Sequence, residues 1–298
     1  MGSADAVPGV SGGTIALIVG IYERLVGAIS QIGVHFFYLL GTFQIRKALA
    51  YIDFRFLVCL VAGILCAIAA VAGSMEYLLR EQREPTLAVF FGLIVGSCII
   101  VARMLRMNDA KSLFLMAIGA VFAFWLVGQP FMAGTHTLLG LFLCGIIAIC
   151  AMILPGISGS YILLILGEYV YVVGTVKTLV HDGLAGSLSQ PELISSLTIL
   201  SVFASGCVIG LVGFSKVLRW LLSRYEHATL AILCGFMVGS LRSLWPFQEL
   251  EERADDLERY VPIAPESASQ LGFAIALALV SMLVLLAIEY VASLRNRN

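Results

Sequence analysis

Two short polar segments interrupt the apolar runs of this chain, and their residue types suit the binding of an anion. Residues 8–13 read Pro-Gly-Val-Ser-Gly-Gly, and residues 155–160 read Pro-Gly-Ile-Ser-Gly-Ser. Proline lacks a backbone N–H and glycine destabilises a helix, so the backbone is predicted to break at both places. A helix that begins after such a break presents free N–H groups and the positive end of its dipole, which suits an anion such as phosphate.

The candidate anion-binding residues open the two half-helices, where hydroxyl and backbone N–H groups are the available donors. Both breaks keep the pattern Pro-Gly-x-Ser-Gly, which favours a binding site over a pair of packing kinks that bind nothing. The candidates are Ser11, Gly12, Gly13 and Thr14 in the first break, and Ser158, Gly159 and Ser160 in the second.

Three ionisable side chains near the apolar runs are further candidates. Arg242 follows a Gly-x-x-x-Gly-Ser segment and could neutralise a phosphate, although an arginine that snorkels to the membrane interface is an equal alternative. Asp5 precedes the first break and Glu168 follows the second, so either carboxylate could bind protons or cations. The alternative for both is helix capping or interfacial exposure.

The composition places these residues in a membrane. Of the 298 residues, 60% are hydrophobic and 12% are charged, with a formal net charge of −1. Soluble domains are about 45–50% apolar and about 25% charged, so a soluble enzyme is excluded. The near-zero net charge leaves no basic excess for nucleic acid. The fold class is therefore an all-α polytopic membrane protein with apolar spans predicted at 56–79, 86–103, 113–127, 193–222, 228–245 and 271–294.

The chain also contains an internal duplication. Residues 4–13 align with residues 151–160, and the segment Thr-Leu-Ala at 86–88 recurs at 229–231. This predicts two inverted-topology repeats, residues 1–127 and residues 138–298, each a re-entrant helical hairpin followed by three transmembrane helices. The first repeat has no counterpart of the apolar arm that precedes the second break, so its first hairpin arm is absent from this sequence.

The distribution of charge predicts the orientation, and the architecture predicts a class of function. Most of the 18 basic residues collect on one side if the N- and C-termini are cytoplasmic, in agreement with the positive-inside rule. Inverted repeats with broken helices are typical of secondary transporters, which bind their substrate between the repeats. No Cys-x-x-Cys pair and no spaced His ligands occur, so we expect no metal, no cofactor and no enzymatic activity.

The paired motifs resemble the PopT family of undecaprenyl-phosphate translocases. The resemblance rests on residues 4–14 and 154–160, together with residues 20–23 and 235–246, and it covers essentially the whole chain. It implies that a polyprenyl-phosphate lipid, the carrier for bacterial envelope polymers, is moved from the outer to the inner leaflet of the cytoplasmic membrane. The missing first hairpin arm departs from the family pattern.

Two other functions stay open at this level. A carrier or channel for a small soluble anion would use the same donors, but it would need a closed aqueous path. An integral-membrane lipid phosphatase or transferase would need a His/Asp or metal constellation at the membrane face, and none is apparent. The expected partners are the lipid and the bilayer, and the sequence is compatible with a homo-oligomer.

Overall fold

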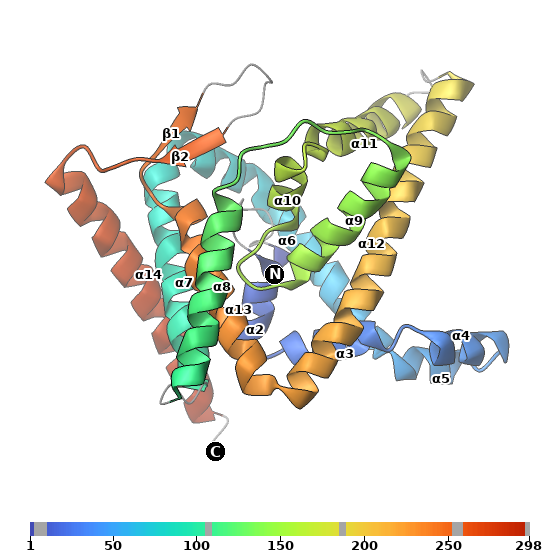
Figure 1. The fold of residues 1–298 in the computed structure, drawn as a ribbon, viewed down its shortest axis with the longest axis horizontal. Coiled ribbons are helices and arrows are strands. Elements are labelled where there is room, and N and C mark those ends of the chain that lie inside the picture. The colour runs from blue at the N-terminus through green and yellow to red at the C-terminus, as the bar shows by residue number, and fades with distance from the viewer. Residues whose placement is uncertain (3–10, 105–108, 185–188, 252–258, 296–298) are drawn as a thin grey trace.

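The computed structural model describes residues 1–2, 11–104, 109–184, 189–251 and 259–295 (Figure 1). Within these residues, six helices are long and apolar enough to cross a membrane, which confirms the predicted spans and the all-α polytopic class. They are α6 (Phe54–Glu81), α7 (Arg83–Met104), α8 (Ala110–Val127), α12 (Gln190–Arg224), α13 (Glu226–Ser240) and α14 (Ala268–Arg295).

Two pairs of short helices are sharply bent, one pair in each half of the chain. Helices α2 (Gly12–Ile18) and α3 (Tyr22–Ser30) meet at 116°, and α10 (Gly159–Ile165) and α11 (Tyr169–Leu184) meet at 113°. In each bend a glycine in the left-handed region, Gly20 or Gly167, ends the first helix. The N–H of the following residue then bonds the carbonyl five residues earlier, at 2.9 and 3.1 Å. The same local chemistry thus makes both bends.

The two bent pairs extend from the centre of the molecule toward opposite ends. In Figure 1, α2 descends from the centre to α3, whereas α10 rises to α11. The apolar helix α9 (Leu138–Ile153) leads into the second break from above. Both half-helices therefore begin near the middle of the structure.

The long helices pack in pairs through small residues. Helix α13 packs on α8, and α14 packs on α7. Helices α7 and α13 share the segment Thr-Leu-Ala near their starts, at 86–88 and 229–231, so the two pairings involve similar helices. A side chain at Gly235 or Gly239 would collide with the backbone of α8, and one at Gly92 would collide with α14. Helix α9 packs on α12 through Gly145, Gly206 and Gly210 in the same way. Small residues thus allow the close helix approach common in membranes.

The remaining elements lie outside these helix pairs. Helices α4 (Val34–Gly41) and α5 (Ile45–Tyr51) form a peripheral hairpin, and η1 (Leu241–Leu244) continues α13. A two-stranded antiparallel sheet, β1 (Gln248–Glu251) and β2 (Arg259–Pro262), precedes α14. The apolar pattern of the sequence does not predict this small sheet.

Candidate functional site where the two broken helices meet

The first break is held against the end of α9 by a serine. Ser11 caps α2, because its Oγ accepts a hydrogen bond from the Gly13 N–H at 3.1 Å. The same hydroxyl donates to the carbonyl of Leu154 at 3.2 Å and lies 3.4 Å from that of Met152. Only 2% of Ser11 is exposed. Its hydroxyl is therefore fully engaged within the protein.

Thr14 joins the first break directly to the second. Its side chain is fully buried, and its Oγ1 accepts a hydrogen bond from the Gly156 N–H at 2.9 Å. Gly156 has a φ of +84°, and its backbone lies against that of Met237 on α13, which leaves no room for a Cβ. The two breaks thus interlock at the centre of the fold.

Two further residues of the first hairpin complete this contact. The Tyr22 hydroxyl donates to the carbonyl of Ile153 at 3.2 Å in the buried interior. Gly13 also faces that carbonyl, since a Cβ there would lie 2.6 Å from the oxygen, and Gly12 is buried beside it. The last carbonyls of a helix have no partner within it. The hydroxyls of Ser11 and Tyr22 satisfy the carbonyls at the end of α9.

The second break is more open than the first. Ser158 precedes α10 but makes no capping hydrogen bond, and its Oγ lies 2.8 Å from the Oγ of Ser160. Ser158 is half-buried and Ser160 is exposed, whereas Gly159 packs against the Ala148 carbonyl. The two hydroxyls bond each other, and each retains further capacity to bind a ligand.

Arg242 lies at the end of α8. Its guanidinium donates to the Phe124 carbonyl at 3.3 Å and lies 4.6 Å from the centre of the Phe124 ring. The Tyr161 hydroxyl of α10 donates to the neighbouring Val127 carbonyl. The structure thus brings Arg242 and Tyr161 of α10 to the C-terminal end of α8. Among the described residues, Arg242 makes no hydrogen bond to the candidate serines or glycines.

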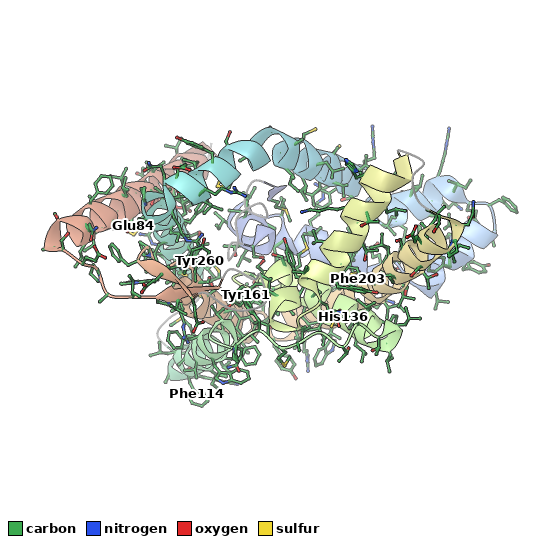
Figure 2. All side chains as sticks on the ribbon, turned by 90° about the horizontal axis from the view of Figure 1, so that it is seen from above. Glu84, Phe114, His136, Tyr161, Phe203 and Tyr260 are labelled. Carbon is green, nitrogen blue, oxygen red and sulfur yellow. The ribbon has the colours of Figure 1, made fainter. Side chains whose placement is uncertain are left out.

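Glu168 is buried and fixed by the linker between α8 and α9. Its carboxylate accepts hydrogen bonds from the His136 N–H and Nδ1, both at 2.9 Å, and lies 3.4 Å from Thr135 Oγ1. Only 1% of Glu168 is exposed, and the His136 ring packs on Tyr171. Sequence reasoning missed His136, because no motif spacing links positions 136 and 168. His136 is labelled in Figure 2.

The last predicted candidate, Asp5, lies outside the described residues, as do Pro8 and Gly9 of the first break. Within the described residues, no group of three or more His, Cys, Asp or Glu side chains could hold a metal ion.

Comparisons with known proteins show the family. Residues 1–259 match the model of a family described as undecaprenyl phosphate translocase-like. A polyprenyl-phosphate transporter of Vibrio cholerae is 38% identical over 274 residues, which cover 92% of this chain and 84% of the relative. A polyprenyl-phosphate transporter of Staphylococcus aureus is 32% identical over 261 residues, or 83% of each chain. No solved structure was found to match. The chain therefore belongs to the undecaprenyl phosphate translocase-like family.

Proposed function

We propose that this protein translocates undecaprenyl phosphate from the outer to the inner leaflet of the bacterial cytoplasmic membrane, and that it is not an enzyme. The family membership and the names of both relatives support this substrate. The observation that carries the proposal is the meeting of two half-helix starts at the centre of an apolar fold, with the half-buried Ser158 and the exposed Ser160 beside it.

The architecture behind this proposal is a pair of inverted repeats, residues 1–127 and residues 138–298. The equivalent bends of 116° and 113°, their opposite directions in Figure 1 and the similar helix pairings support it. Substrate then binds between the repeats, as in other transporters of this construction. With both termini on the cytoplasmic side, the basic loops obey the positive-inside rule.

In this mechanism the phosphate binds first at Ser158, Gly159 and Ser160, the open break. The first break, Ser11 to Thr14, offers its donors only after its hydrogen bonds to residues 154 and 156 separate. A charged phosphate is costly to move through hydrocarbon, so donors on both breaks replace its water while the polyprenyl tail stays in lipid. Arg242 supplies a counter-charge, and Glu168 or Asp5 couples the step to protons.

The test is leaflet-to-leaflet movement of undecaprenyl phosphate in vesicles that contain the purified protein. Ser158→Ala combined with Ser160→Ala is expected to slow translocation about tenfold, the equivalent of about 1.4 kcal/mol. The matched control is Ser201→Ala with Ser205→Ala, two exposed serines of α12 that bond only their own helix.

Three outcomes would contradict the proposal. Failure of the wild-type protein to move the lipid would remove the substrate assignment, and unchanged movement by the Ser158/Ser160 variant would remove the assigned site. Release of inorganic phosphate from the lipid during the assay would favour a phosphatase over a transporter.

A further inference from the structure

Helices α4 and α5 form a hairpin at the end of the molecule where α8 begins and α12 ends. In Figure 1 the pair extends sideways from the long helices, which run from one end of the molecule to the other. Helix α4 packs mainly on α5, and α5 packs on α4 and α6. In the second half of the chain α11 ends at Leu184 and α12 begins at Gln190, too close together for a pair of helices between them. The hairpin is therefore particular to the first half.

Large apolar side chains cover the outside of the hairpin. On α4, Val34, Phe37 and Tyr38 follow the i, i+3, i+4 spacing of one helix face, and each is more than 60% exposed. Phe43, in the turn after α4, is 88% exposed and has a φ of +56°. Glycine is the usual residue in this left-handed conformation, so an aromatic ring directed outward here is unusual. We call these four residues the apolar face of the hairpin.

The membrane interface is the environment that suits this hairpin. An apolar face of this kind is unfavourable in water. A helix of eight residues, such as α4, is about 12 Å long and the hydrocarbon core is about 30 Å thick, so neither helix can span it. The charges of Arg46 and Lys47 on α5 are also costly in hydrocarbon. At the interface, aromatic rings reach the apolar layer while cations stay among the headgroups.

The last turns of α12 independently place the hairpin at this depth. Lys216 Nζ lies 3.0 Å from the position of a Cβ at Gly33, the residue before α4. The Arg219 guanidinium donates to Ser30 Oγ, at the end of α3, at 3.2 Å. The next residue, Trp220, is 56% exposed. Lysine, arginine and tryptophan near the end of a span are typical of the membrane interface, so the hairpin begins at that level.

The charge of the hairpin favours an anionic lipid over a neutral one. Arg46 and Lys47 on α5 and Arg55 at the start of α6 are all exposed. Between residues 33 and 55 the sequence contains one carboxylate, Asp53, and it is paired with Arg24 at 2.7 Å. The segment therefore has an excess of positive charge. Basic residues close to a membrane surface attract anionic phospholipids.

We propose that the α4–α5 hairpin lies in the plane of the membrane interface and binds anionic phospholipids. Its apolar face enters the outer part of the hydrocarbon layer, and Arg46, Lys47 and Arg55 contact the phosphate headgroups. The occupant of this surface is the bulk lipid of one leaflet, of which phosphatidylglycerol is the example to be tested. The central breaks take no part, so the inference does not rest on the proposed function.

The test places a tryptophan in the apolar face. Full-length protein with Phe43→Trp is reconstituted into vesicles of phosphatidylcholine and phosphatidylglycerol, and one of the two lipids carries bromine on its acyl chains, which quenches nearby tryptophan. The signal of the three native tryptophans is measured in the parent protein and subtracted. We expect brominated phosphatidylglycerol to quench at least about twofold more strongly than brominated phosphatidylcholine at equal mole fraction.

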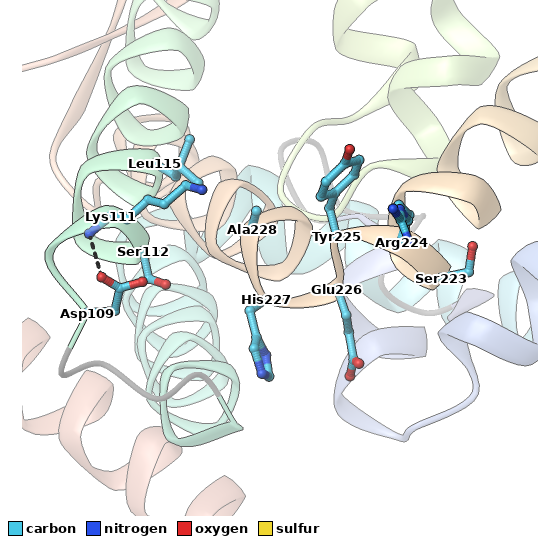
Figure 3. Close-up of a pocket in the computed structure, with 10 residues that line it drawn as sticks. All are labelled: Asp109, Lys111, Ser112, Leu115, Ser223, Arg224, Tyr225, Glu226, His227 and Ala228. Atoms are coloured by element: carbon cyan, nitrogen blue, oxygen red, sulfur yellow. Dashed lines mark hydrogen bonds between the residues drawn. The ribbon is translucent and has the colours of Figure 1, made fainter.

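Removal of the cations tests which residues recognise the charge. Arg46→Gln, Lys47→Gln and Arg55→Gln together should reduce the ratio of the two quenching efficiencies to about one, while both lipids still quench the reporter. The matched control removes three exposed cations at the same end of the molecule and should leave the ratio unchanged: Arg103→Gln, Lys111→Gln and Arg224→Gln. Figure 3 shows Lys111 and Arg224 of this control set. Thermal unfolding verifies that each variant is folded.

Four outcomes would overturn the inference. Quenching by neither lipid would place the hairpin outside the bilayer, and equal quenching by both lipids would remove the preference for anionic lipid. An unchanged ratio in the folded triple variant would assign the preference to other residues. Quenching that disappears as the protein-to-lipid ratio rises, with dimers captured by cross-linking, would make a second copy the occupant. Failure of lipid translocation in vesicles would overturn only the proposed function.

Discussion

The two bent helix pairs are held in different ways. The first is fixed at its break, where Ser11 and Thr14 bond residues 154 and 156, and the ion pair beside its bend, Arg24 and Asp53 at 2.7 Å, is exposed. The second is fixed at its tip by the buried Glu168, while its break leaves Ser158 and Ser160 accessible. Two helix pairs with matching backbone bends thus differ in how they are held.

A single pair of residues shows how this difference arises. By the sequence repeat, Gly13 corresponds to Ser160, and the two positions have opposite surroundings. A side chain at position 13 would meet the Ile153 carbonyl, whereas the side chain at position 160 is exposed. Gly13 permits close contact in the first break, and the Ser160 hydroxyl is available in the second. Single substitutions at the break or at the bend of each helix pair test this difference.

Gly13→Ser is expected to have the largest effect. It places the residue of the second break into the first, where the added Cβ would lie 2.6 Å from a backbone oxygen, at a cost of about 3 kcal/mol in the free energy of unfolding. The measurement is denaturation in detergent. Gly27→Ser is the control, because nothing lies within 4 Å of a Cβ there, and it should cost less than about 1 kcal/mol. Equal losses from both variants would contradict the close contact.

Thr14→Val tests the hydrogen bond between the breaks. The substitution keeps the shape but leaves the Gly156 N–H without its acceptor, which should lower the free energy of unfolding by about 2 kcal/mol. Thr175→Val in α11 is the control, since Thr175 only donates to a carbonyl of its own helix and should change stability by less than about 1 kcal/mol. A Thr14 variant as stable as the wild type would show that the breaks separate freely.

Glu168→Gln addresses the tip of the second hairpin. The amide loses the charge that strengthens two hydrogen bonds from His136, so we expect a loss of about 1.5 kcal/mol. Faster hydrogen exchange of the His136 amide should accompany it. If exchange there stays as slow as in the wild-type protein, the carboxylate does not hold the tip.

Ser160→Gly is the reciprocal of the first substitution, and its effects should separate stability from transport. The side chain is exposed, so the free energy of unfolding should change by less than about 0.5 kcal/mol. Translocation of undecaprenyl phosphate in vesicles should fall about fivefold, as expected for one lost hydrogen bond of about 1 kcal/mol. A loss of stability without a loss of transport would reverse the roles assigned to the two breaks.

Arg24→Gln should have the smallest effect, because the pair it breaks is exposed to solvent. The Arg24 guanidinium, through its hydrogen bond, lowers the pKa of Asp53, so the substitution should raise that pKa toward its ordinary value, measurable by NMR titration. A carboxylate whose pKa is lower in the folded than in the unfolded protein stabilises the fold at a pH above its unfolded-state pKa. This stabilisation is lost as the pH falls through its folded-state pKa. If Arg24→Gln lowered stability at neutral pH as much as Glu168→Gln, the two bends would not differ in how firmly they are held.

Much of the fold was predictable because it depends on local composition. The apolar runs predicted the six long helices found in the described part of the chain. The site was predictable only in part. The Pro-Gly-x-Ser-Gly motifs located both breaks, but the pairing of His136 with Glu168 and the sheet over α7 depend on contacts between segments far apart in the chain.

The sequence by itself determined where the backbone breaks and where it bends. Proline and glycine act on their own neighbours, so the bends at Gly20 and Gly167 follow from local conformational preference. Only the tertiary structure decided which hydroxyls remain accessible. Ser11 and Ser158 occupy equivalent places in one motif, yet Ser11 is engaged because the end of α9, about 140 residues away in the chain, presents its last carbonyls beside it.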